Sequence, residues 1–251
     1  MLLRAALTSF RRGSTLDAAP VSTSVTADRS HLAAYNAVCG FRLTDELPVT
    51  YPHVLGFGLQ MRLMTGPGFP FPLPGLVHVA NRITQTRPLR ADEPLEISVS
   101  AAGLREHPSG MQVDVVTSVN DVWHDVSTYL KRTKDGSAPG ERPERPASAA
   151  VWHVPGDIGR RYARVSGDRN PIHLHPLTAK VFGFRRAIAH GMWTKARCLA
   201  SLEGRLPEAF TVEVGFKAPL LLPGKAFFAF SDGEFSVWGR ERPHLLGTWT
   251  A

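Results

Sequence analysis

The sequence predicts an α+β protein made of two related halves, each with one main helix followed by antiparallel strands. Three observations lead to this fold class. The stretch DGSAPGERPERPASAA (135–150), rich in Pro, Gly, Ser and Ala, divides the chain of 251 residues. The segments YNAVCGF (35–41) and YARVSGD (162–168) share Tyr, Val and Gly at the same spacing. Both halves then alternate apolar and polar residues, as half-buried strands do.

The overall composition is that of a soluble globular protein. Hydrophobic residues make up 43% of the chain and charged residues 20%, and no apolar run is long enough to span a membrane. The net charge is +7, but we find no Lys/Arg block and no zinc-finger spacing. We therefore interpret the charge as an Arg-rich solvated surface, and expect neither a nucleic-acid partner nor a membrane.

The two cysteines and the N-terminal segment bear on the compartment. Cys39 and Cys198 lie far apart and form no CxxC pair, which favours a reducing compartment. The first sixteen residues, MLLRAALTSFRRGSTL, contain three arginines and no acid, as mitochondrial presequences do. We expect a cytoplasmic protein, with mitochondrial import as the less favoured alternative.

The first half contains one helix and then strands. Leu55, Leu59 and Leu63 recur every fourth residue, with Met61 and Met64 beside them, which predicts a helix with an apolar face. The predicted strands are GLVHVANRITQTRPL (75–89), LEISVSAA (95–102) and MQVDVVTSV (111–119). HPSG (107–110) predicts a turn between the last two.

The second half follows the same order. The segment HGMWTKARCLASLEG (190–204) places Met192, Ala196, Leu199 and Ala200 on one face at helical spacing. The predicted strands after it are FTVEVGFKAPLLLPG (210–224), AFFAFS (226–231), EFSVWG (234–239) and HLLGTWT (244–250). Each half thus allows a sheet to wrap around a helix.

One stretch of the second half carries candidate chemistry: VSGDRNPIHLHP (165–176). Pro171 fixes its own φ and keeps Asn170 out of the helical region, so the backbone between Asp168 and His173 is stiff. A rigid bend can direct two side chains five positions apart at a common point. A carboxylate and an imidazole directed at one water form an acid–base pair suited to adding or removing water across a double bond.

The first half lacks these groups, since Phe41, Leu43 and Glu46 stand opposite Asp168, Asn170 and His173. The histidines of the second half also raise the question of a metal. His173 and His175 could be joined by His190 or His153, but no fourth ligand follows at a recognisable spacing. We therefore predict no metal, and we expect that His190 either lines the site or packs near it.

The string YARVSGDRNPIHLHPLTAKVFGF (162–184) resembles the signature of the MaoC-like dehydratases, also called (R)-specific enoyl-CoA hydratases or hydratase 2. The resemblance extends to AIAHGMW (187–193) and VEVGFKAPLLLPG (212–224). It implies a double hotdog, in which two long helices are each wrapped by an antiparallel sheet. Residues 1–134 would form a degenerate N-terminal hotdog, 135–150 a linker and 151–251 the catalytic hotdog. The two would pair as a pseudo-dimer, and homodimerisation of the whole chain stays open.

The resemblance also assigns roles to single residues. The family's catalytic acid and histidine fall on Asp168 and His173, and its oxyanion-hole glycine falls on Gly191. Asn170 falls on the motif residue that orients the site. The implied reaction interconverts (3R)-hydroxyacyl and trans-2-enoyl thioesters, and which of Asp168 and His173 acts as the base stays open.

Substrate and cofactor follow from the same resemblance. The implied chemistry uses no metal or redox cofactor. CoA or the phosphopantetheine of acyl carrier protein enters as part of the substrate. Leu59, Met61, Leu63 and Met64 form a candidate acyl-chain pocket, with simple core packing as the alternative. Two other functions stay open: hotdog thioester hydrolysis, and a non-catalytic subunit that binds acyl thioesters or a partner protein.

Overall fold

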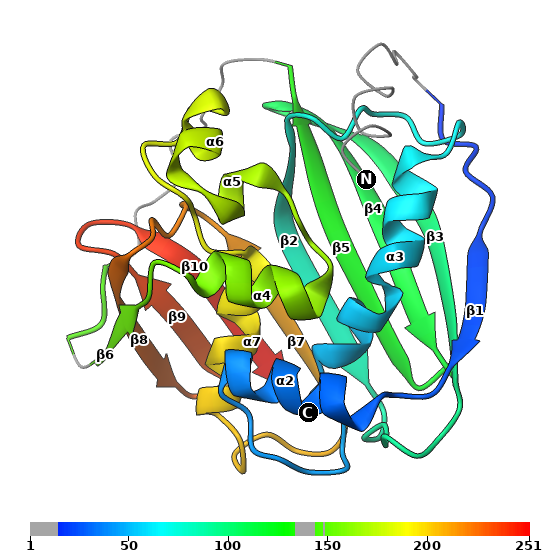
Figure 1. Ribbon diagram of the computed structural model, residues 1–251, viewed down its shortest axis with the longest axis horizontal. Coiled ribbons are helices and arrows are strands. Elements are labelled where there is room, and N and C mark those ends of the chain that lie inside the picture. Colours follow the sequence, from blue (N-terminus) through cyan, green and yellow to red (C-terminus); the bar gives the residue numbers. More distant parts are fainter. Residues whose placement is uncertain (1–14, 134–143, 148) are drawn as a thin grey trace.

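The computed structural model describes residues 15–133, 144–147 and 149–251. Its main element is one continuous antiparallel sheet of ten strands, with the helices on one face (Figure 1). The order across the sheet is β1-β3-β4-β5-β2-β7-β10-β9-β8-β6. Since β2 pairs with β7, the sheets of the two halves join edge to edge, and we call this β2–β7 pairing the seam.

The two halves have the same topology. Strands β1 to β5 of the first half correspond, in chain order, to strands β6 to β10 of the second half. The sheet order is symmetric about the seam, with β1 and β6 as the two outermost strands. The first-half strands are β1 (Val21–Val25), β2 (Leu76–Gln85), β3 (Leu95–His107), β4 (Gly110–Val119) and β5 (Trp123–Arg132). The second-half strands are β6 (Ala150–Val154), β7 (Phe210–Phe216), β8 (Gly224–Ser231), β9 (Glu234–Trp238) and β10 (Pro243–Thr250). The predicted double-hotdog architecture is thereby confirmed.

The repeated motifs form a pair of equivalent helices, α2 (Arg29–Cys39) and α4 (Ile158–Ser166). Each ends at a glycine in the left-handed region, Gly40 at φ 87° and Gly167 at φ 75°, a conformation that other residues adopt only with strain. The shared tyrosines meet between the halves, with ring centroids 6.3 Å apart. Each half therefore has a helix before its main helix, which the alternation of the sequence did not predict.

The main helices are α3 (Tyr51–Thr65) and α7 (Gly191–Ser201), and both were predicted. The four residues expected on the apolar face of α7 are all buried: Met192, Ala196, Leu199 and Ala200. On α3, Leu63 is buried, whereas Leu55 and Leu59 are half-buried. The second half also inserts two short helices before α7, namely α5 (Pro171–Leu174) and α6 (Pro176–Val181).

All the predicted strands are present, but β1, β5 and β6 were not predicted. The expected linker at 135–150 lies largely outside the described residues, and its last residue, Ala150, begins β6. No helix in the described part of the chain combines the length and the apolar character needed to cross a bilayer.

Candidate active site

The backbone of the motif is a tight turn between two helices. After Gly167 ends α4, the Asn170 side chain caps α5 by accepting the Ile172 N–H at 3.4 Å. The Asp168 carboxylate accepts the Asn170 N–H at 3.0 Å. Pro171 is the first residue of α5, where its missing N–H costs nothing. Asn170 therefore shapes the turn, which places Asp168 just before α5 and His173 within it.

Asp168, His173 and His190 come together at this turn, and one potential ligand atom from each lies within 4.8 Å of the others. The Nδ1 of His173 lies 2.8 Å from the Ile188 carbonyl oxygen. Because a carbonyl only accepts, Nδ1 carries the proton and Nε2 keeps a free lone pair. The rings of His173 and His190 stack with centroids 3.7 Å apart. The structure thus brings together the two predicted catalytic residues and adds His190 to them.

His190 is buried and holds Asp168 from the other side. Its Nε2 donates to the Asp168 backbone carbonyl at 3.1 Å and lies 3.7 Å from the carboxylate. The only sequence signal for this residue was its place directly before Gly191 in AIAHGMW. We interpret it as a positioning residue, since its Nε2 contacts Asp168 and its ring stacks on His173.

The electrostatics favour an ionised Asp168 and neutral histidines near pH 7. Burial alone would raise the pKa of Asp168, but the combined effect of His190, His173, the Asn170 N–H and His53 brings the pKa below its usual value. Burial lowers the pKa of His173, although Asp168 partly opposes this. Burial also lowers the pKa of His190 to about 3. Asp168 and the Nε2 of His173 are therefore both hydrogen-bond acceptors.

Gly191 is the first residue of α7, and the His190 side chain makes no capping bond to that helix. The first N–H groups of a helix have no partner within it and point along the positive end of its dipole. A Cβ atom at Gly191 would lie 2.9 Å from the ring of Phe216. A larger residue at 191 would force the ring or the backbone to shift, and the oxyanion role of Gly191 stays a prediction.

This arrangement has defined chemical capabilities. Two acceptors can hold and deprotonate one water, and an N–H at a helix start can stabilise a developing negative oxygen. The same three side chains also make a donor set that a divalent metal could use. Two of the four imidazole nitrogens, however, already donate to carbonyl groups. Of the other histidines considered, His175 caps α6 and His153 is exposed on β6.

The predicted acyl-chain residues lie on α3. Leu63 and Met64 are 3% and 2% exposed and belong to the core, whereas Leu59 and Met61 are half-buried against it. The same helix approaches the motif at Phe57, whose ring lies 3.5 Å from the position of a Cβ at Gly167. The helix thus reaches the catalytic turn, and part of its apolar surface is uncovered.

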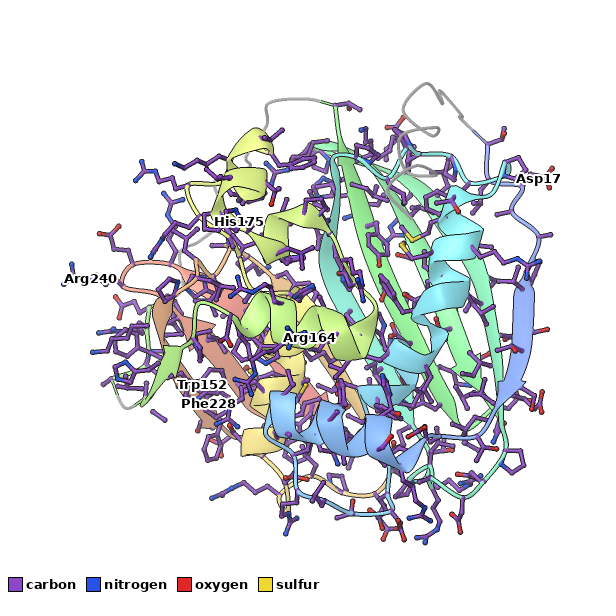
Figure 2. The ribbon with its side chains drawn as sticks, in the orientation of Figure 1. Asp17, Trp152, Arg164, His175, Phe228 and Arg240 are labelled. Atoms are coloured by element: carbon purple, nitrogen blue, oxygen red, sulfur yellow. The ribbon has the colours of Figure 1, made fainter. Side chains whose placement is uncertain are left out.

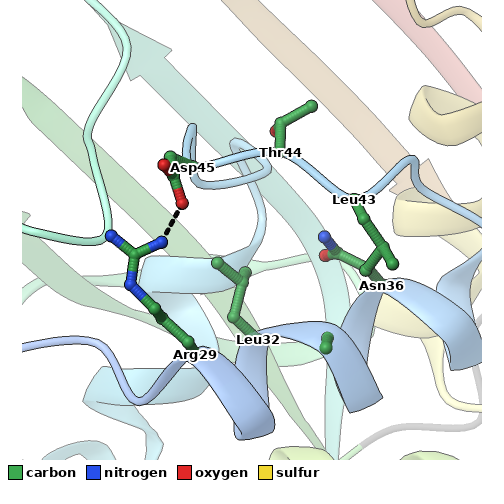
Figure 3. Close-up of a pocket in the computed structure, with 7 residues that line it drawn as sticks. Arg29, Leu32, Asn36, Leu43, Thr44 and Asp45 are labelled. Atoms are coloured by element: carbon green, nitrogen blue, oxygen red, sulfur yellow. Dashed lines mark hydrogen bonds and ion pairs between the residues drawn. The ribbon is translucent and has the colours of Figure 1, made fainter.

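A surface pocket lies elsewhere, between α2 and the loop that follows it (Figure 3). Arg29 and Asp45 form an ion pair at its edge. Its lining consists of Arg29, Leu32, Ala33, Asn36, Leu43, Thr44 and Asp45. None of these residues belongs to the predicted site.

A second polar cluster, which the sequence did not predict, lies at the seam. Lys195 on α7 is fully buried, and its Nζ donates to the Asn81 side-chain oxygen at 2.5 Å and to the Val212 carbonyl at 3.2 Å. Burial lowers its pKa to about 7, against the opposing effect of Asp125. The sequence did contain one signal for this cluster: Lys195 is a charged residue on the apolar face of the predicted helix.

Asp125 on β5 continues this cluster into the first half. Its carboxylate accepts from Asn81 Nδ2 at 2.6 Å and from the Ser127 hydroxyl at 3.0 Å, and it lies 2.6 Å from Nδ1 of His53. All of these groups are buried. Because Lys195 stands one helical turn after Gly191, the cluster ties the start of α7 to the first half.

Comparison with known proteins identifies the family. A model of the MaoC-like domain matches residues 134–221. The chain is 42% identical over 237 residues to 3-hydroxyacyl-thioester dehydratase X of Mycobacterium tuberculosis, covering 88% of this chain and 85% of that protein. The crystal structure of HtdX from M. tuberculosis superposes with a TM-score of 0.82 at 40% identity, covering 92% and 99% of the two chains.

A more distant structure supports the architecture alone. An M. tuberculosis protein described as having a double hotdog fold superposes with a TM-score of 0.57 at 13% identity, over 97% of each chain. The family assignment rests on the sequence match over most of the chain and on the shared fold. The chain belongs to the MaoC-like dehydratase family.

Proposed function

We propose that the chain catalyses the reversible hydration of trans-2-enoyl thioesters to (3R)-hydroxyacyl thioesters. The observation that carries this proposal is the gathering of the Asp168 and His173 acceptors within 4.8 Å, beside the start of α7. The relative named a 3-hydroxyacyl-thioester dehydratase, identical at 42% of positions, supports the same chemistry.

In the hydration direction, Asp168 and His173 hold one water against C3 of the substrate. The water loses a proton to this pair, its oxygen bonds to C3, and the electron pair of the C2–C3 double bond moves towards the thioester carbonyl. The Gly191 N–H accommodates the charge on that oxygen. The Asp168–His173 pair then delivers the proton it took from the water to C2, so that one water is added, the pair is regenerated and no electrons are gained or lost. Every step uses side chains, backbone and substrate only.

The two halves divide the work in this proposal. Residues 151–251 form the catalytic half, and residues 1–134 form a half without catalytic groups, with 135–150 as the connection. The acyl chain lies along α3, against Leu59, Met61, Leu63 and Met64. A substrate presented on CoA or on a carrier protein uses the same catalytic groups. The cytoplasm is the proposed compartment, since Cys39 and Cys198 are both free and buried.

The proposed function is tested with crotonyl-CoA. We expect the enoyl absorbance to fall as water adds, and the product to be the (3R) isomer. Release of free CoA thiol without hydration would instead support a thioesterase. Binding of crotonyl-CoA without turnover would support a non-catalytic acyl-binding subunit.

Chain-length preference tests the proposed pocket. We compare enoyl-CoA substrates of increasing length in the wild type and in Met61→Trp, which narrows the uncovered part of α3. Each buried CH₂ contributes about 0.8 kcal/mol at most, so the variant should lose the longer substrates first. An equal change in kcat/KM for all lengths would place the acyl chain elsewhere.

A further inference from the structure

Exposed apolar side chains gather on α6, directly after the catalytic turn. Leu177, Val181 and Phe182 are 65%, 82% and 48% exposed. Leu177 and Val181 are four residues apart and therefore share one side of the helix. In the described part of the chain, seven large apolar side chains are exposed, and these three lie within six residues of one another. Such clustering is typical of a surface that another molecule covers.

The same region carries unbalanced positive charge. Its basic residues are Arg160, Arg161, Arg164, Arg169, Lys180, Arg185 and Arg186. The only acids between 157 and 186 are Asp157 and the catalytic Asp168. Other arginines of the chain pair with carboxylates, as Arg87 does with Glu93 and Arg105 with Asp114. Within the described residues, none of the seven basic side chains of this region forms an ion pair.

This surface adjoins the catalytic groups. Helices α4, α5 and α6 lie next to one another in that order, with α4 in front of α7 (Figure 1). His173 lies on α5, and α6 begins two residues after α5 ends. Arg160 donates to the Leu174 carbonyl at 3.3 Å, which ties α4 to α5. Arg164 and His175 lie on the side of this group of helices that faces the viewer in Figure 2.

We infer that this surface, defined by the three apolar residues of 177–182 and the seven basic residues of 160–186, docks an acidic carrier protein. The inference rests on the proposed function and specifies its substrate: the acyl group arrives as a phosphopantetheine thioester attached to that protein. The nucleotide part of CoA, the alternative carrier, would contact a few of the positive charges. It would leave the exposed apolar side chains of α6, Leu177 and Val181, uncovered. A folded partner with an acidic rim and an apolar centre uses both features, which is the usual composition of a protein–protein interface.

The test compares one acyl group on two carriers. Crotonyl-CoA and a crotonyl thioester of a purified acidic acyl carrier protein are supplied to the wild type and to two double variants. Leu177→Ser/Val181→Ser removes the apolar stripe, and Lys180→Glu/Arg185→Glu reverses part of the charge. Matched controls are Leu43→Ser/Phe230→Ser, which alter exposed apolar residues elsewhere, and Arg205→Glu/Lys225→Glu, which alter exposed charges elsewhere.

We expect both docking variants to lower the ratio of kcat/KM for the carrier-bound substrate to that for the CoA substrate by about tenfold or more. The loss should appear mainly in KM, and the control variants should keep the wild-type ratio. For the wild type, KM for the carrier-bound substrate should rise with salt, because opposite charges steer the encounter.

Several results would overturn the inference. One is an unchanged ratio in the docking variants, and another is a wild type that hydrates crotonyl-CoA but not the carrier-bound substrate. A change of oligomeric state in Leu177→Ser/Val181→Ser would show that the surface joins two copies of this chain. Loss of binding to anionic lipid vesicles in that variant would show a membrane surface instead. If the wild type hydrates neither substrate, the proposed function itself has failed.

Discussion

At the scale of single residues, the geometry of the site depends on two backbone positions, Gly191 and Ile188. The ring of Phe216 leaves space only for glycine at 191, and the Ile188 carbonyl fixes the proton of His173 on Nδ1. The first constraint lies outside the reacting side chains, and the second acts on His173 through a backbone carbonyl. Both decide where a lone pair or an N–H points, and the Gly191 constraint can be tested by substitution.

The first residue-scale prediction concerns Gly191→Ala. The added methyl group meets the Phe216 ring, so the start of α7 must shift, and the proposed oxyanion donor moves with it. We expect kcat to fall by roughly 10²-fold, in the range measured for removal of one oxyanion donor. The double variant Gly191→Ala/Phe216→Leu frees the space and should recover part of the rate. No recovery, or no initial loss, would remove steric packing from the explanation.

The second residue-scale prediction concerns pH. Burial holds the pKa of His173 below the ordinary histidine value of 6.5. Protonation removes the lone pair on Nε2, so activity is present above the folded-state pKa and is lost as pH falls through it. We expect kcat/KM for crotonyl-CoA to stay level from about pH 8 to 6.5 and to fall only at lower pH. A loss of activity centred above 6.5 would mean that the pKa of His173 is raised instead.

At the scale of elements, the start of α7 is held by the buried cluster at the seam. Lys195 reaches Asn81 on β2 and Val212 on β7, and so contacts strands from both halves. Asn81 in turn donates a hydrogen bond to Asp125 on β5. The helix that begins with Gly191 is thereby fixed against the first half.

We therefore predict that Lys195→Met destabilises the fold. The change leaves the buried Asn81 oxygen without its donor, which costs about 1–3 kcal/mol, whereas Lys225→Met at an exposed position should stay within about 0.5 kcal/mol of the wild type. The pKa of Lys195 is about 7 in the fold, against about 10.4 in an unfolded chain. Between these values the unfolded chain binds more protons, so this group stabilises the wild type increasingly as pH rises.

The measurement is denaturant unfolding of both variants near pH 7 and pH 9. The free energy lost in Lys195→Met should be larger at the higher pH. Equal losses for Lys195→Met and Lys225→Met would contradict a structural role for the cluster.

At the scale of the whole molecule, the two hotdogs share one sheet. The seam pairs β2 with β7 over Ala80–Gln85 and Phe210–Gly215, and Thr84 and Thr211 hydrogen-bond across it at 3.0 Å. The contact between the Tyr35 and Tyr162 rings and the Lys195 cluster add further contacts between the halves. None of these contacts can form when either half is unfolded.

We therefore predict that the chain unfolds as one cooperative unit. Differential scanning calorimetry should show a single transition whose calorimetric and van't Hoff enthalpies agree. Two separate transitions would show that the halves are independently stable and that the seam contributes little.

The sequence could predict the parts of this molecule that depend on neighbours in the chain. Asp168 and His173 are five residues apart, so the motif revealed them together, and most strands showed their alternation. Strand β5 was missed because its buried positions include Asp125 and Ser127, which hide the apolar period. Lys195 and Asn81 are 114 residues apart, so only the folded chain could reveal their contact.

The central claim is that Asp168 and His173 carry out the reaction, and it is tested most directly by the hydration rate of crotonyl-CoA in Asp168→Asn and His173→Ala. Circular dichroism and thermal unfolding first establish that each variant keeps the fold. General acid–base groups contribute about 10²- to 10⁴-fold, and we predict a loss of that size in both variants. A folded variant that keeps more than about a tenth of the wild-type rate would fall outside this range and contradict the account for that residue.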